Sequence, residues 1–405
     1  RELEGLPVAV KDQPDIKGQP MTMGSLYLKD NVSAETDFSI QRLLDAGVIV
    51  HGRTTTGEFC CSGVSDSKIH GTTHTPWKNG YTCGGSSGGS GAALAVGSTP
   101  LATGSDIGGS IRIPAACCGV VGYKPPYGRN PGCSAVHFDT YAVMGPMTRT
   151  VSDAVIMQNL LCGPHPLDNA SIRPKYVLPN SYEDIQGLKI AWSMDLGFFE
   201  VDEHVHANTM KTLDVLKDLG AELVEVDFGW SAGADRDLLN YLDHLFNGYI
   251  KSIVDTDPDL ATPWATYCAN AAGKTSAADF SAAYETQAKM SRHVGAIMDG
   301  CYAFICPTCN FQEIPADQDP NDPVVINGKT VDPLYGWCMA HPFNMLGRLP
   351  VLSVPSGIGG NGLPTGIQIV ARHLDDERVF RVATALEKAQ PWLDCPERRP
   401  CLLRA

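Results

Sequence analysis

A glycine- and serine-rich stretch carries the clearest candidate chemistry in this chain. Residues 84–114 read GGSSGGSGAALAVGSTPLATGSDIGGSIRIP, with no charged residue before Asp106. Ser110 follows two glycines in the turn DIGGS. Glycines let the backbone approach a ligand closely, and backbone N–H groups gathered at such a turn can stabilise a tetrahedral oxyanion. The turn is therefore a candidate oxyanion hole beside a serine nucleophile.

Lys11 is the candidate base for this serine. A serine hydroxyl is a poor nucleophile at neutral pH and needs a base to accept its proton. Lys11 ends the apolar run LPVAV, which should draw the side chain into the core. Burial lowers the pKa of a lysine and lets it act as a neutral base. Taken alone, a lysine at a strand end more often faces solvent, so this role depends on the wider pattern.

The same stretch also matches other motifs. A linker would stay polar, but this stretch leads into an alanine-rich helix and then into apolar sequence. A phosphate-binding loop needs a lysine, and none occurs from Cys83 to Val120. Residues 85–89 match the G-x-S-x-G nucleophile elbow, with Ser87 as nucleophile and His341 or His373 as base. That elbow hydrolase is kept as an alternative, although no hydrophobic strand precedes it.

Composition limits the class of protein. The chain has 405 residues, of which 43% are hydrophobic and 19% charged, as in a globular protein with a sizeable core. The net charge of −14 and the lack of a basic cluster argue against a nucleic-acid partner. No run of about 18 apolar residues predicts a membrane span. We expect a cytoplasmic protein, and because the chain enters strand-like sequence directly after Arg1, we expect a missing N-terminal segment, in which a signal peptide stays open.

The 14 cysteines do not follow a disulfide or metal pattern. The adjacent pairs at 60–61 and 117–118 lie among small or apolar residues, where reduced cysteine packs as a small hydrophobe. Cys306 and Cys309 form a C-x-x-C, but it ends a strand-like run rather than opening a helix, as a redox motif would. No second ligand pair suits zinc. We expect neither a metal nor an organic cofactor.

Strand-like and helix-like segments alternate along the chain. Strands are predicted at 6–12, 47–52, 188–192, 222–226, 302–306 and in the two runs LPVLSVPSG and GIQIV, the first two as short buried strands. Helices are predicted at 37–46, from Asp202 to Gly220, at 277–300 and at 375–388. This alternation predicts one large α/β/α layered domain over residues 1–405, with a central mixed, mostly parallel twisted sheet covered by helices on both faces.

Taken together, these motifs resemble the amidase signature family. The resemblance rests on the 84–124 stretch, on GLPVAVKD at the start, on GPMTRTVSDA (145–154), and on LGRLPVLSVPSG with GLPTGIQIVARHLDDERVFRVATALE near the end. It is strong over 1–155, which would form the catalytic core, and good over 345–390, which would return the chain to the sheet. Residues 230–340 look divergent and would set substrate specificity.

The resemblance implies a catalytic serine–serine–lysine triad. Ser110 would be the nucleophile, Ser86 the bridging serine held in a cis peptide bond, and Lys11 the terminal base. The backbone amides of Ile107, Gly108, Gly109 and Ser110 would form the oxyanion hole. The reaction implied is acyl transfer through an acyl-enzyme on Ser110.

Further residues receive supporting roles. Ser87, Asp106 and Arg112 are expected to brace the loops, the last two by pairing with each other. In the family, the positions of Cys60, Cys61 and Ser62 line the acyl side of the pocket. The aromatic candidates for an apolar or aryl site are Phe138, Tyr141, Tyr249, Trp264 and Trp337.

The expected substrate is a neutral amide, aryl amides included, with esters and carbamates (urethanes) attacked in the same way. The protein would act as a monomer or homodimer on a small molecule. A different class within the family stays open: the glutamine-hydrolysing component of tRNA-dependent amidotransferases, which works inside a complex. A binding protein with a dead site is disfavoured, because Lys11, Ser86 and Ser110 are all present.

Overall fold

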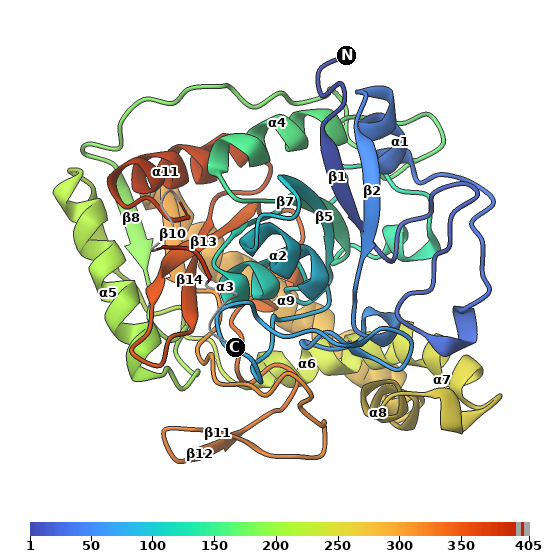
Figure 1. The fold of residues 1–405 in the computed structure, drawn as a ribbon. Coiled ribbons are helices and arrows are strands. Elements are labelled where there is room, and N and C mark those ends of the chain that lie inside the picture. Colours follow the sequence, from blue (N-terminus) through green and yellow to red (C-terminus); the bar gives the residue numbers. More distant parts are fainter. Residues whose placement is uncertain (394–397, 401–405) are drawn as a thin grey trace.

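A ten-stranded sheet forms the centre of the molecule (Figure 1). The computed structural model describes residues 1–393 and 398–400. The strand order is β2-β1-β5-β7-β6-β13-β14-β10-β8-β9. The pairs at the two ends, β2-β1-β5 and β10-β8-β9, are parallel. All pairs from β5 to β10 are antiparallel.

The elements have the following bounds. The strands are β1 Pro7–Lys11, β2 Ile49–Thr54, β3 Asp66–Ser67, β4 Gly71–Thr72, β5 Leu101–Asp106, β6 Val121–Lys124, β7 Val143–Thr148, β8 Lys189–Trp192, β9 Glu222–Glu225, β10 Ala303–Pro307, β11 Val324–Ile326, β12 Lys329–Val331, β13 Val351–Ile358 and β14 Pro364–Val370. The α-helices are α1 Phe38–Asp45, α2 Gly88–Ala95, α3 Arg112–Cys118, α4 Val151–Leu161, α5 Glu203–Asp218, α6 Gly233–Leu242, α7 Gly248–Val254, α8 Pro263–Ala271, α9 Ala277–Gly300, α10 Pro342–Met345 and α11 Asp376–Ala389. Shorter helical turns are η1 Leu26–Leu28, η2 Glu58–Cys60, η3 Ala135–Phe138, η4 Asp243–Asn247 and η5 Pro258–Leu260.

Helices cover both faces of the sheet. On one face, apolar side chains of β1, β5, β6, β13 and β14 pack against α1, α4, α5 and α11. On the other face, Ala9 and Ala102 pack against α2 and α3, and a larger cluster joins β10 and β13 to α6, α9 and the 334–349 segment. Alternate residues of each strand point to opposite faces, which separates these clusters. The α/β layered fold with a mixed sheet expected from the sequence is confirmed.

Most predicted elements agree closely with the structure. The helix predicted at 277–300 is α9, whose start is fixed by a capping box between Ser276 and Asp279. Asp202 caps α5 through a hydrogen bond from the His204 amide. The prediction of a buried strand at 47–52 is wrong in burial: β2 lies at the edge of the sheet, and Ile49 is 57% exposed.

Candidate active site

The side chain of Lys11 reaches the α2–α3 face because of its place in β1. Ala9 packs against α2 on that face, and a side chain two residues along a strand points the same way. β1 pairs in parallel with β5, placing Ala9 opposite Ala102. The ends of β1 and β5 therefore lie side by side, with Lys11 next to the residues that precede the DIGGS turn.

Lys11 is completely buried and bonded only to hydroxyl groups. Its Nζ lies 2.7 Å from Ser86 Oγ and 2.8 Å from Ser105 Oγ. Ser105 Oγ in turn donates to Gln13 Oε1 at 2.5 Å. Burial lowers the pKa of Lys11, against opposing effects from nearby Cys60, Asp106 and Asp12. A lysine in such surroundings can lose its proton and act as a base.

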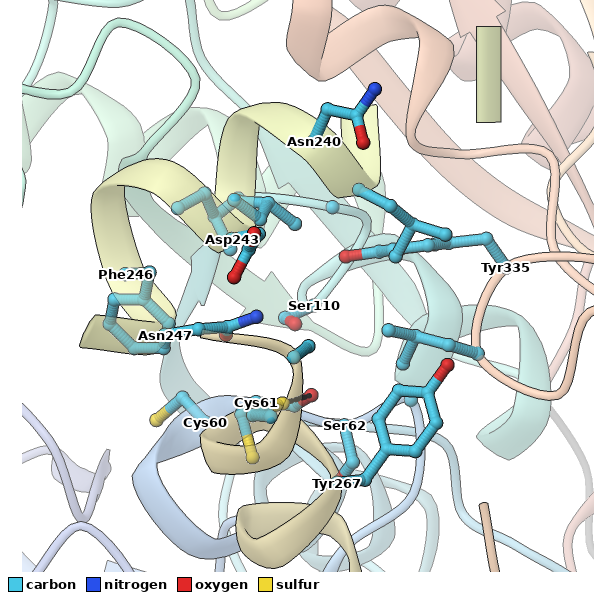
Figure 2. A pocket seen from close by; sticks show the side chains of 18 of the residues that line it. Cys60, Cys61, Ser62, Ser110, Asn240, Asp243, Phe246, Asn247, Tyr267 and Tyr335 are labelled. Atoms are coloured by element: carbon cyan, nitrogen blue, oxygen red, sulfur yellow. Dashed lines mark hydrogen bonds between the residues drawn. The ribbon is translucent and has the colours of Figure 1, made fainter. Parts of the chain in front are cut away.

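Ser86 lies in the loop before α2, and the peptide bond between Gly85 and Ser86 is cis. The following residue ties this loop to the DIGGS turn, because the Ser87 amide donates to the Ser110 carbonyl oxygen at 3.2 Å. The Ser110 hydroxyl makes no hydrogen bond within the described part of the chain and faces a cavity (Figure 2). The structure thus brings Lys11, Ser86 and Ser110 into one site.

A buried ion pair holds the turn that carries Ser110. Asp106 accepts from the Gly109 and Ile111 amides at 2.8 and 3.2 Å and from the Arg112 guanidinium at 3.0 Å through both of its oxygens. Burial alone would raise the pKa of Asp106, but the Arg112 charge and hydrogen bonds lower it to about 2. The predicted pairing of Asp106 with Arg112 is present in the structure.

The backbone amides of the turn differ in availability. The Gly109 amide is already bonded to Asp106, so of the predicted oxyanion donors it is the occupied one. No hydrogen bond from the amides of Ile107, Gly108 or Ser110 occurs among the described residues. Gly108 has to be glycine, because a Cβ there would lie 2.6 Å from the Tyr335 hydroxyl.

The cavity in front of Ser110 has a volume of about 210 Å³. Cys60, Cys61 and Ser62 line one side of it, as the sequence predicts for the pocket (Figure 2). The other walls come from α6 and η4, from α8 and the following loop, and from Leu334 and Tyr335. Much of this lining belongs to the 230–340 region that the sequence singled out for specificity.

The predicted aromatic pocket residues do not line this cavity. Phe138 is 60% exposed on η3, and Tyr249 is 51% exposed on α7. Tyr141 is buried in a stack on Tyr241 with ring centroids 4.0 Å apart. Trp337 and Trp264 are buried in the core; Trp337 supports the cavity from behind Gly63. Burial of these rings in the core, or their exposure on the surface, removes them from the site.

The residues of the alternative elbow are separated from the cavity. Ser87 is fully buried, and its hydroxyl donates to the Ser105 carbonyl oxygen at 3.4 Å, consistent with loop support. His341 Nε2 lies 2.6 Å from Asp235 Oδ1, and His373 lines a different pocket. No histidine in the described residues hydrogen-bonds to Ser87.

Sequence reasoning missed several polar residues of the site. Ser105 and Gln13 contact Lys11 directly or through one hydroxyl. Gln368 and Asn344 accept from Arg112 at 2.8 and 2.6 Å. A glutamine within the apolar strand GIQIV is a usable signal, since buried polar groups need partners. Asp243 and Tyr335 carried no comparable signal.

Neither a metal-ligand cluster nor a membrane-spanning helix is found in the described residues. Among residues 1–393 and 398–400, no three His, Cys, Asp or Glu side chains come together as metal ligands. The helices of that same part of the chain are too short or too polar to cross a bilayer. Every cysteine within it is free, including Cys306 and Cys309.

Comparison with known proteins identifies the family. A family model described as Amidase matches residues 1–380. The chain belongs to the amidase family. An acylamidase of Rhodococcus erythropolis is 34% identical to this amidase over 97% of this chain and 83% of that protein. A solved bacterial aryl acylamidase of the amidase signature family superposes with a TM-score of 0.89 at 28% identity, covering 96% of this chain and 83% of that one.

A second kind of relative is almost as similar to this amidase. The first component, called A, of the glutamyl-tRNA(Gln) amidotransferase of Caldanaerobacter subterraneus subsp. tengcongensis is 31% identical over 96% of this chain and 83% of that protein. The resemblance to the amidase signature family is therefore confirmed, and with it an amide hydrolase. Similarity to both kinds of relative leaves the substrate to be inferred from the site.

Proposed function

We propose that this amidase hydrolyses the C–N bond of small amides through an acyl-enzyme on Ser110, with Ser86 and Lys11 relaying the proton. One observation carries the proposal: the fully buried Lys11 amine lies 2.7 Å from Ser86 Oγ. Ser86 in turn belongs to the loop that is hydrogen-bonded to Ser110. The lowered pKa of Lys11 makes a neutral amine available as base.

Ser105 sets the direction of proton transfer. The side-chain oxygen of Gln13 can only accept, so the Ser105 hydroxyl gives it its proton. Ser105 Oγ must then accept from Lys11. A neutral amine that donates to Ser105 keeps its lone pair for the proton of Ser86. This arrangement favours Lys11 as acceptor at the end of the relay.

The reaction then runs in two halves. As Ser110 Oγ attacks the carbonyl carbon, its proton passes to Ser86 while Ser86 passes its own to Lys11. The C–N bond breaks, and the amine leaves with the proton returned through Ser86. Water attacks the acyl-enzyme by the same relay and releases the acid. The open amides of Ile107, Gly108 and Ser110 would hold the oxyanion, while Asp106 keeps Gly109 in place.

The walls nearest Ser110 suit an uncharged acyl or aryl group. Ile107, Ile113 and Leu334 lie in the lining with Cys61, and a small cavity limits the size of the bound part. The acylamidase and aryl acylamidase relatives support amides, aryl amides included. Esters and carbamates present the same carbonyl, so we expect some of them to react.

Labelling of the nucleophile tests this proposal. A serine-reactive sulfonyl fluoride should modify Ser110, as mapped by peptide mass spectrometry, and the adduct should be lost in Lys11→Ala. Hydrolysis of an aryl amide should fall about 10²–10⁴-fold in that variant, the usual contribution of a general base. Lys17→Ala, which removes an exposed lysine nearby, is the control. A Lys11-independent adduct on Ser87 would overturn the mechanism.

The amidotransferase relative defines the second candidate function. If this chain worked as part of such a complex, it would release ammonia from glutamine and bind partner proteins. Rapid glutamine hydrolysis with no turnover of aryl or aliphatic amides would favour that function over the stand-alone amidase.

A further inference from the structure

The cavity has a second polar wall, formed by η4. This segment is a π-helical turn joining α6 to α7, a rare geometry that is found frequently at functional sites. Asp243 and Asn247 begin and end it, and both line the cavity. Figure 2 shows both side chains directed from the helix toward the space in front of Ser110.

Asp243 is a buried carboxylate that is only half satisfied. Its side chain belongs to a residue that is 6% exposed. Oδ2 accepts from the Thr275 amide at 2.9 Å, which anchors the loop after α8. Oδ1 has no hydrogen-bond partner within the described residues. The structural contact with Thr275 therefore uses one oxygen and leaves the other free for a ligand.

An ionised carboxylate accepts hydrogen bonds and donates none. A buried carboxylate oxygen without a partner is costly, since its water has been removed and nothing replaces it. The side chains that line the cavity beside Asp243 include Leu239, Leu242 and Phe246, which offer no donor. A ligand that brings an N–H group, above all a cationic one, supplies what the site lacks.

Lys274 is the one cationic side chain in the lining, and it does not fill this role. It is exposed at the edge of the cavity, and its ammonium group forms no ion pair with Asp243 in the described structure. Asn247 is 9% exposed, and its amide makes no side-chain hydrogen bond in that same structure. It offers a second polar group beside the same space.

We propose that Asp243 binds a protonated amine on the substrate, so that the preferred substrates are small amides carrying an ammonium group away from the scissile bond. This inference rests on the proposed function, in which Ser110 attacks the amide. The scissile end remains uncharged and packs against the apolar wall. The ammonium group lies toward η4 and pairs with the open oxygen of Asp243.

Isosteric substrate pairs test the proposal directly. Glycyl, β-alanyl and 4-aminobutyryl p-nitroanilides differ from propionyl, butyryl and pentanoyl p-nitroanilides by exchange of NH₃⁺ for CH₃. Acetylated 4-(aminomethyl)aniline and 4-ethylaniline form a pair with the charge on the amine side. In at least one pair, we expect the ammonium member to have the higher kcat/KM at pH 7, by about tenfold, the usual value of a hydrogen bond to a charged group.

Asp243→Asn should abolish that preference. The variant keeps an oxygen for the Thr275 amide but loses the charge, so kcat/KM should fall about tenfold for the ammonium member and stay within about threefold for its methyl isostere. Asp237→Asn, on α6 outside the cavity and bonded to Thr286, controls for a general loss of negative charge. A preference for the methyl member in every pair, or an equal loss for both members in Asp243→Asn, would overturn the proposal.

Binding without turnover separates this proposal from the proposed function. Calorimetric titration of Ser110→Ala with each pair measures recognition alone. Tighter binding of an ammonium member, lost when Asp243→Asn is added, supports the role of Asp243 even if wild-type protein hydrolyses nothing. Equal binding of both members in every pair overturns it. Absence of hydrolysis together with an ammonium preference counts against the proposed reaction only.

Discussion

Replacing Arg112 with methionine should destabilise this protein strongly and in a pH-dependent way. The guanidinium makes five hydrogen bonds: two to Asp106 and one each to Ala340 O, Gln368 and Asn344. Both members of the ion pair have fully buried side chains. Methionine fills similar space but leaves the Asp106 charge without its partner. Removing one member of a buried pair costs about 3–5 kcal/mol.

The pH dependence follows from the pKa of Asp106. In the wild type this pKa is lowered from 3.8 to about 2, so the pair contributes stability above about pH 4 that is lost as pH falls toward 2. The shift is worth about 2.5 kcal/mol. Without Arg112, burial becomes the main influence and raises the pKa of Asp106, so the charged form destabilises the variant. Its deficit in unfolding free energy should be largest at pH 7 and smaller at pH 4.5.

Urea unfolding followed by tryptophan fluorescence measures both effects. The double variant Asp106→Asn/Arg112→Met should recover part of the loss, because it leaves no buried charge. Arg378→Met, which breaks a partly exposed pair with Asp375, should cost less than about 1 kcal/mol. A deficit below 1 kcal/mol for Arg112→Met, an equal deficit at both pH values, or a double variant no more stable than the single one would refute this reasoning.

Three further predictions concern neighbouring groups. Because neutral Lys11 is the proposed base, kcat/KM should rise with pH through a lysine pKa below its ordinary value; a rate that is flat or falls over pH 6–9 would contradict this. Ser105→Ala should lower kcat about tenfold with little change in KM, since it removes one of the two partners that orient Lys11, and steady-state kinetics would show an unchanged kcat if Ser105 were irrelevant. Burial lowers the pKa of Lys124 from 10.5 to about 7, so the wild type loses stability as pH falls from 10.5 to 7, by about 5 kcal/mol. Lys124→Met should therefore be stabilised relative to wild type at pH 6 and not at pH 10.5, and urea unfolding with the same gain at both pH values would contradict this.

Local patterns in the sequence were enough to predict the individual elements. Asp202 and Ser276 cap their helices with their own side chains, an interaction between residues only a few positions apart. The apolar run before Lys11 and the glycines around Ser110 likewise depend on near neighbours. Such signals survive in a single sequence because their physical cause is local.

Other features depend on which segments meet in three dimensions. Ile49 is exposed because β2 has a neighbour on one side only. The aromatic rings expected in the pocket pack into the core or lie on the surface, since apolar character predicts burial but not which surface is contacted.

The sequence by itself determined the elements, the turn that carries Ser110 and the candidate proton relay, because these follow from short-range chemistry. Only the tertiary structure decided that Ser105 orients Lys11, that Arg112 is held by Gln368 and Asn344, and that Asp243 opposes Ser110 across the cavity. These pairs are separated by tens to hundreds of residues. Their proximity results from strand order and helix packing, which no local pattern records.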